Sequence, residues 1–287
     1  MKVIALLSPA KTVVEASAIR AAAAADPPLL AQADRVQRAV REHPDQGSLW
    51  NIKQAPLLKH FRELTDAWVP AADPERAARS APASCVFGGG VAFKALDPEG
   101  LYALGDDIIT CWLNENLFIL SGSYGVVRGG DAVQPVRCDM GTRKLTEIGS
   151  LYDYWEDHVW RVLAHAVDHD DPEEDLVVVD VASSEYSKAV DFKALRDARP
   201  SLKVVRPCFK DGGVTRAAYA KPARGAFCRF LATAQPTTLE DLRSFDLRGY
   251  RYGHSTTTKD GVIEMIFEGD SGATAKKNND AKRRRVG

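Results

Sequence analysis

The sequence lacks the long apolar runs that would mark an integral membrane protein. Its longest apolar stretches, such as residues 3–7 and 176–179, are far shorter than the roughly 20 residues of a membrane-spanning helix. The chain begins with Met1 and Lys2 and passes directly into a strand-like run, with no small-residue cleavage site of a signal peptide. We therefore expect no membrane partner and a cytoplasmic location.

Several motifs that would assign a cofactor are also missing. The five cysteines are an odd number without C-x-x-C spacing, which argues against a disulfide framework or a zinc ribbon. The pattern G-x-x-x-x-G-K-[ST] is absent, and the glycines at 88–90 lack the spacing of a nucleotide loop, so we interpret them as a turn. His165 and His169 lie beside the acidic residues 168, 170 and 171, but a polar helix end is the simpler interpretation because no third ligand is fixed. We expect no cofactor and no metal site.

Positive charge is concentrated in two segments, although the formal net charge of the 287 residues is only −1. Residues 201–230 carry seven lysines and arginines against one carboxylate, and residues 271–287 carry six against one. The rest of the chain is therefore strongly acidic. An anionic partner should be attracted to the two basic segments and repelled elsewhere.

Apolar periodicity predicts a mixed α/β (α+β) fold in one globular domain, residues 1–268. Short apolar runs alternate with amphipathic segments, which is typical of a mixed sheet flanked by helices. Glycine-containing turns predict a hairpin near 211–213 and a C-terminal hairpin near 259–261. The basic tail, residues 269–287, has almost no large apolar side chains and is expected to be disordered. The predicted strands are 3–7, 117–120 and 176–181, and the predicted helices are 29–40, 57–68, 151–166 and 225–234.

Similar polar stretches follow the three predicted strands. Parallel strands end at one edge of a sheet, where α/β proteins bind ligands, so these stretches predict an anion-binding cleft at the strand C-terminal ends. Small residues would let backbone amides approach an anion, and lysine and arginine would supply the charge. The alternative is that the glycines only form turns and the serines only cap helices. The residues in question are Ser8 and Lys11 after the first strand, Ser121, Gly122, Tyr124, Gly125 and Arg128 after the second, and Glu185 and Lys188 after the third.

Six blocks of sequence resemble the YaaA family of peroxide-stress proteins, in the order in which that family has them. They extend from residue 6 to residue 252 and include the three strand ends. The blocks are "LLSPAKT" (6–12), "LSGSYGVVR" continuing to "MG" (120–141), "LYDYW" (151–155), "ASSEYSKAV" (182–190), "AKPARGAFCRF" (220–230) and "FDLRGYRY" (245–252).

The resemblance implies a positively charged cleft that binds double-stranded DNA through a helix-hairpin-helix-like element. It also implies a role in limiting iron-dependent DNA damage by peroxide. We place no such element in the sequence, because the turn at 122–125 has one residue too many between its glycines. Basic residues interleaved with aromatics in 201–230 agree with nucleic-acid binding, although a solvated basic face is the alternative. Further candidates for phosphate contacts are Gln134, Arg137, Lys210, Lys221, Arg224 and Arg229.

Two other interpretations stay open at this stage. An enzyme acting on a nucleotide, a nucleoside or a flipped base could use Asp131 or Glu185 as its base and Lys11 or Arg128 as its anion clamp. The basic residues 282–285 could be a nuclear address or an arm that adds affinity for DNA. Cys138 and Cys228 each have an arginine neighbour in the sequence, but we expect them to be buried and inert.

Overall fold

The computed structural model of the chain describes residues 1–167, 175–247 and 249–269. Its strands are β1 Lys2–Leu7, β2 Ala81–Pro82, β3 Leu117–Ser121, β4 Gly125–Arg128, β5 Ala132–Val133, β6 Leu176–Asp180, β7 Lys203–Asp211, β8 Tyr250–Thr257 and β9 Val262–Gly269. Its α-helices are α1 Leu30–Glu42, α2 Gln46–Leu49, α3 Ala55–Asp66, α4 Ala83–Val86, α5 Val91–Leu96, α6 Pro98–Ala103, α7 Asp107–Glu115, α8 Leu151–Val167, α9 Ser184–Ser187, α10 Phe192–Ala198, α11 Ala217–Ala234 and α12 Leu239–Leu242. Three short 3-10 helices are η1 Ala16–Ala18, η2 Pro74–Arg79 and η3 Phe87–Gly89.

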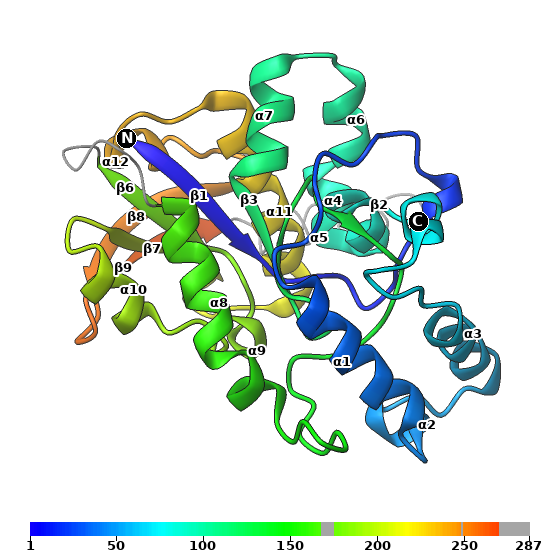
Figure 1. Cartoon of the computed structure of the whole chain (residues 1–287). Helices are drawn as coiled ribbons and strands as arrows, with labels where there is room; N and C mark the ends of the chain where they lie inside the picture. The colour runs from blue at the N-terminus through cyan, green and yellow to red at the C-terminus, as the bar shows by residue number, and fades with distance from the viewer. Residues whose placement is uncertain (168–174, 248, 270–287) are drawn as a thin grey trace, which may run out of the picture.

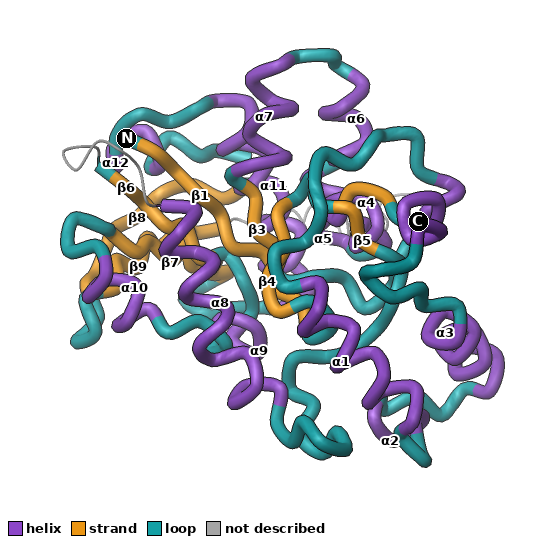
Figure 2. Tube along the Cα trace, viewed as in Figure 1, coloured by secondary structure: helices purple, strands orange, loops and turns teal. Residues whose placement is uncertain are grey.

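A seven-stranded sheet in the order β4-β3-β1-β6-β7-β9-β8 forms the centre of the molecule (Figure 2). The five inner strands are parallel, and the edge strands β4 and β8 run antiparallel to their neighbours. Since β1, β3 and β6 are neighbours, the residues that follow them leave at the same edge of the sheet. The predicted mixed sheet and the C-terminal hairpin, β8 with β9, are confirmed.

Both faces of the sheet are covered by helices, because its strands are apolar on both sides. In β1, Val3, Ala5 and Leu7 belong to one core cluster, and Ile4 and Leu6 belong to the other. The first cluster packs under α5, α7 and α11, and the second packs under α1, α3, α8 and α10. Figure 1 shows α8 and α1 in front of the sheet and α11 behind it. The fully apolar runs of the sequence are thus the inner strands of a three-layer fold.

Helices α5 and α11 cross in direct contact behind the sheet. A Cβ atom built on Gly225 of α11 would lie only 1.7 Å from the carbonyl oxygen of Ala92 in α5. The glycine therefore lets the two backbones touch. The crossing places the N-terminal halves of both helices beside the end of β1.

The predicted hairpin near residues 211–213 is wrong. Gly212 and Gly213 do form a turn with positive φ angles, but only a single bridge between Asp211 and Val214 follows it. The chain then enters α11, which begins eight residues earlier than the predicted helix and contains Pro222. Proline removes one amide donor from the helix. The exposed position of Ala218, four residues earlier, leaves the freed carbonyl close to solvent.

Two sequence-based predictions fall largely outside the described residues. They are the disordered tail, of which only Gly269 is described, and the acidic segment around His169. Among the helices within the described ranges, none combines the length and the apolar character that crossing a lipid bilayer requires.

Candidate functional site

A cavity of about 600 Å³ opens at the edge of the sheet where the inner strands end. The segments following β1 and β6 form one side, and α5 and α11 form the other. The volume is typical of a small-molecule site rather than of a packing defect. Its lining is Leu7, Ser8, Pro9, Ala10, Lys11, Thr12, Gly90, Val91, Ala92, Phe93, Val181, Ser183, Ser184, Glu185, Tyr186, Lys221 and Arg224.

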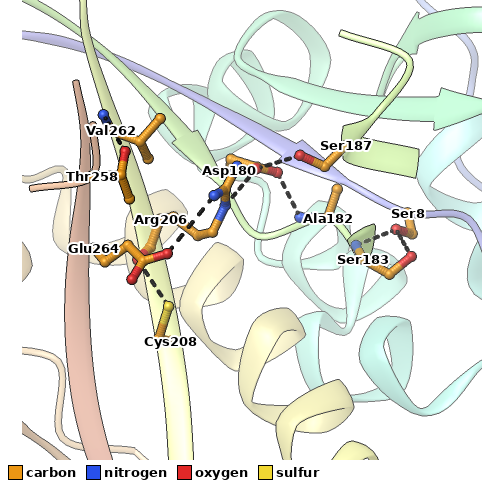
Figure 3. A network of polar contacts seen from close by, with 10 residues as sticks. All are labelled: Ser8, Asp180, Ala182, Ser183, Ser187, Arg206, Cys208, Thr258, Val262 and Glu264. Atoms are coloured by element: carbon orange, nitrogen blue, oxygen red, sulfur yellow. Dashed lines mark hydrogen bonds and ion pairs between the residues drawn. The ribbon is translucent and has the colours of Figure 1, made fainter. Parts of the chain in front are cut away.

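Two serines join the ends of β1 and β6 at the cavity (Figure 3). The amide of Ser183 donates to Ser8 Oγ at 2.8 Å, and Ser8 Oγ donates to Ser183 Oγ at 3.1 Å. These contacts follow from the parallel pairing of the two strands, which brings together residues 175 positions apart. The prediction that these two strand ends converge is confirmed.

Lys221 and Arg224 bring positive charge to the cavity from α11. They are three residues apart and so share one face of the helix. Neither forms a hydrogen bond or an ion pair with any residue in the described ranges. Burial lowers the pKa of Arg224, and the attraction of Asp180 works in the opposite direction. A half-buried guanidinium without a partner is a costly arrangement that an anionic ligand would relieve.

Lys11 and Glu185 lie on the strand side of the cavity, and each has one polar partner at hand. Lys11 Nζ lies 2.8 Å from Asp139 Oδ2, and the lysine side chain is 58% exposed. Glu185 Oε1 accepts a hydrogen bond from the amide of Gly141 at 3.3 Å. Tyr152 donates to the backbone carbonyl of Glu185. Both charged groups are therefore positioned while keeping part of their bonding capacity free.

A buried carboxylate, Asp180, organises the floor next to the cavity (Figure 3). It accepts from Arg206 Nε at 3.0 Å, from Arg206 Nη2 at 2.9 Å, from Ser187 Oγ at 2.7 Å and from the amide of Ala182 at 3.1 Å. Glu264 lies 3.9 Å from the other side of the Arg206 guanidinium. A smaller cavity of about 70 Å³ adjoins this network, and Arg224 lines both cavities.

The loop after β3 does not contribute to the cavity, and the expectation that it offers free amides is corrected. Residues 121–125 form the tight turn between β3 and β4. The amides of Ser123 and Tyr124 donate to Ser121 Oγ. A Cβ atom on Gly122 would lie 2.3 Å from the Cys138 carbonyl oxygen, so no space for an anion remains there. This segment connects two strands, whereas the turn of a helix-hairpin-helix element would connect two helices.

Two residues of the following segment, Arg128 and Asp131, have internal structural contacts. Arg128 pairs with Glu115 at 3.2 Å, near the beginning of β3 and away from the cavity. The predicted convergence of Arg128 with Lys11 is therefore wrong, because β4 turns back antiparallel to β3. Asp131 accepts from the amide of Arg128 at 2.7 Å, and burial raises its pKa to about 7.

Gln134 and Arg137 are also held within the fold. The buried Gln134 side chain bonds the amide and the carbonyl of Val69. Arg137 is 11% exposed, donates to the Trp50 carbonyl and stacks over Phe61 at 5.0 Å. It reaches Asp139 at 3.7 Å. The Arg137 guanidinium therefore interacts with groups of the protein beside the cavity and does not line the cavity.

The remaining predicted cations occupy three different places. Arg229 donates to the Leu96 carbonyl at 2.9 Å and to Asp97 at 3.2 Å, so it ties α11 to the end of α5. Lys188 is exposed and lines a neighbouring pocket with three acidic residues, Asp153, Glu156 and Asp191. Lys210 is half-buried on β7. Of the predicted anion-binding residues, the cavity lining contains Ser8, Lys11, Lys221 and Arg224.

Cysteine chemistry does not define the site. Burial raises the pKa of Cys138 to about 12, and it also raises the pKa of Cys228. Both thiols are buried and protonated at neutral pH, as the sequence predicted. Cys208 lines the smaller cavity, and burial raises its pKa as well.

Sequence reasoning missed the carboxylate and the arginine of the floor network. Asp180 is the last residue of a fully apolar strand, and a single charge in that position is a signal that could have been used. Arg206 carries no comparable signal, because its partner lies 26 positions away. The wall formed by residues 91–93 was missed because apolar residues of a short helix look like ordinary core.

A family model described as peroxide stress protein YaaA matches residues 1–256 of this chain. The chain belongs to that family. A UPF0246 protein of Psychrobacter sp. (strain PRwf-1) is 34% identical over 259 residues, which cover 86% of this chain and 92% of the relative. A UPF0246 protein of Verminephrobacter eiseniae (strain EF01-2) is 35% identical over 265 residues, covering 90% and 96%. One from Ruegeria pomeroyi is 38% identical over 205 residues, covering 70% and 72%. YaaA family membership supports a role in peroxide stress.

Proposed function

We propose that this protein acts in the response to hydrogen peroxide by binding double-stranded DNA at the mouth of the cavity. Lys221 and Arg224 would contact backbone phosphates, with Lys11 at the opposite rim. A protein that neutralises phosphates releases the cations condensed on them. Bound ferrous iron would be released in the same way, which would limit the iron-dependent damage that peroxide causes to DNA.

The observation that carries this proposal is the pair of unpartnered cations on α11. Most other basic side chains of the region are bonded to carboxylates or carbonyls, as Arg206 and Arg229 are. Positive charge that is not neutralised within the protein is available to an external anion. The two residues lie in the more central of the two basic segments of the sequence.

Duplex binding measured across a range of salt concentrations tests the proposal. We expect the affinity of the wild type to fall steeply with salt, and the slope of log K against log salt to decrease by about 2 in Lys221→Ala/Arg224→Ala. Lys59→Ala removes an exposed cation on α3 and serves as the matched control. Binding by the wild type that is absent or independent of salt would exclude the DNA function.

A second candidate is an enzyme that acts on a nucleotide, a nucleoside or a flipped base. The observation that favours it is the Glu185 carboxylate in a cavity of about 600 Å³, which suits a small substrate better than a duplex. Glu185 would act as the base, with Lys11 and Arg224 holding the anion. Turnover of a base or nucleoside by the wild type and its loss in Glu185→Gln, with DNA binding retained, would support this candidate.

A further inference from the structure

The charged groups that line the cavity suit an anion with two charges. Lys221 and Arg224 have no partner within the described ranges and bring two positive charges to one side of the lining, whereas Lys11 is paired with Asp139. A terminal phosphate monoester carries about −1.5 to −2 at neutral pH, whereas an internal phosphodiester carries only about −1. The lining charge therefore matches a phosphate at the end of a molecule better than a phosphate within a continuous strand.

Neutral donors lie among the same residues as these charges. Ser8 Oγ accepts from the Ser183 amide and donates to Ser183 Oγ. The hydroxyl hydrogen of Ser183 is then free to donate to a ligand, since its oxygen is already an acceptor. Two cationic groups and a positioned hydroxyl form the kind of mixed donor set that phosphate oxygens require.

Another part of the lining, beside the cations of α11, is apolar and exposed. Val91 is 51% exposed although it lies in a cavity wall, and Ala92 and Phe93 follow it in α5. Pro9 and Ala10 belong to the same lining from the strand side. A valine left uncovered in a concave site offers surface to the flat face of a ring or to a sugar. A bare phosphate would leave this wall unused.

An acceptor completes the lining. Glu185 Oε1 takes one hydrogen bond, from the Gly141 amide, and no bond to Oε2 is present within the described ranges. A carboxylate oxygen in this state can accept from an exocyclic amino group or a ring N–H of a base.

We propose that the cavity binds a nucleoside 5′-monophosphate unit, with its terminal phosphate at Arg224, Lys221 and Ser183 and its base between Val91 and Glu185. This inference rests on the proposed function, because both place a nucleic-acid anion at the same two cations. Two sources share this chemistry. One is a free nucleotide, and the other is a 5′-phosphorylated end of broken DNA.

Titration calorimetry of the full-length protein with three small probes tests the pocket. We expect deoxyadenosine 5′-monophosphate to bind at least about tenfold more tightly than inorganic phosphate or deoxyadenosine, because only the nucleotide uses both parts of the lining. Ser183→Ala and Arg224→Ala should each weaken it by about tenfold. Lys59→Ala is the matched control, and circular dichroism checks that every variant is folded. Equal affinity for the nucleotide and for inorganic phosphate would overturn the inference.

Three duplexes separate the two sources and separate this inference from the DNA function. They are a closed dumbbell without ends, a duplex with 5′-hydroxyl ends and the same duplex with 5′-phosphates. Preference for the 5′-phosphorylated duplex by about tenfold supports a DNA end as the source. Nucleotide binding without that preference supports the free nucleotide. Salt-dependent binding of the dumbbell without any nucleotide binding would overturn this inference and leave the DNA function standing. Nucleotide binding without any binding of the dumbbell would support this inference and count against the DNA function.

Discussion

Two arginines of α11, five residues apart, differ in almost every physical respect. Arg229 donates to the Leu96 carbonyl and pairs with Asp97, so its charge is used to hold α11 against α5. Arg224 lines the cavity, has no hydrogen-bond partner in the described ranges, and has a pKa lowered by burial. The sequence presents both as members of one basic segment. Only the environment separates a structural arginine from one that is free for a ligand.

The same distinction divides the basic residues of the whole candidate site. Arg128 and Arg137 belong with Arg229, since carboxylates or carbonyls bind their guanidinium groups. Lys221 belongs with Arg224. Counting charges along the sequence therefore overstates how many of them can act on a partner. The variants below test this comparison, beginning with the largest expected effect.

The first variant concerns Asp131, which accepts a hydrogen bond from the amide of Arg128 and so helps to position one of the paired arginines. Burial raises the pKa of Asp131 from 3.8 to about 7, so the folded protein keeps a proton that the unfolded chain has already lost between these values. The contribution of the protonated Asp131 carboxyl to the free energy of unfolding is complete below about pH 4 and is lost as the pH rises through 7. Asp131→Asn cannot ionise, and its stability relative to the wild type should rise between pH 4 and pH 8 by no more than about 4 kcal/mol. Urea unfolding at both pH values measures this, with the exposed Asp153→Asn as control. A difference that does not change with pH would contradict it.

Asp180→Ala would turn a paired arginine into an unpaired one. The change removes four hydrogen bonds to a buried carboxylate, and of the acidic residues that the structure describes it leaves Arg206 with Glu264 alone, at 3.9 Å. We expect the free energy of unfolding to fall by about 3 kcal/mol. Ser187→Ala removes one of these bonds and should lower it by only about 1 kcal/mol. Equal losses in the two variants would show that Asp180 does not organise the floor as described.

Arg229→Ala removes a purely structural arginine. Its bonds to Leu96 and Asp97 are lost, and the free energy of unfolding should fall by about 1.5 kcal/mol. The affinity of the folded protein for duplex DNA should be unchanged, because this side chain is not part of the cavity lining. Denaturation and binding measured on the same preparation decide the point. A loss of affinity in folded protein would remove the distinction between the two arginines.

Arg224→Gln should give the opposite pattern with the smallest change in stability. No hydrogen bond to another described residue is lost, so the free energy of unfolding should change by less than about 0.5 kcal/mol. Duplex affinity should fall instead. If this variant is as destabilised as Arg229→Ala, its guanidinium has a structural role that the contacts do not explain.

Much of the fold could be predicted from the sequence, because the inner strands are short apolar runs and the helices are amphipathic. The convergence of Ser8 and Ser183 followed from the parallel order of β1 and β6. The place of Arg128 could not be predicted in this way. Its place depends on the antiparallel pairing of β4 with β3. The glycines and serines between the two strands do not show in the sequence that the chain turns back there.

Residues 121–125 show most clearly why a polar, glycine-rich segment is ambiguous. The same small residues that let an amide approach an anion also let one backbone approach another. Here the second use applies, since Gly122 lies against Cys138 and Gly125 against Trp155. The floor network was invisible for a different reason, because Asp180 and Arg206 come together only when β6 and β7 pair.

Gly225 gives the cavity a fixed width. Because the backbones of α5 and α11 are in direct contact at this position, the separation between the wall that carries Val91 and the helix that carries Arg224 is short and defined. A single added methyl group would act as a wedge between them and would move the apolar wall relative to the cations. The distance over which the protein can span a ligand is thus set by an atom that the sequence leaves out.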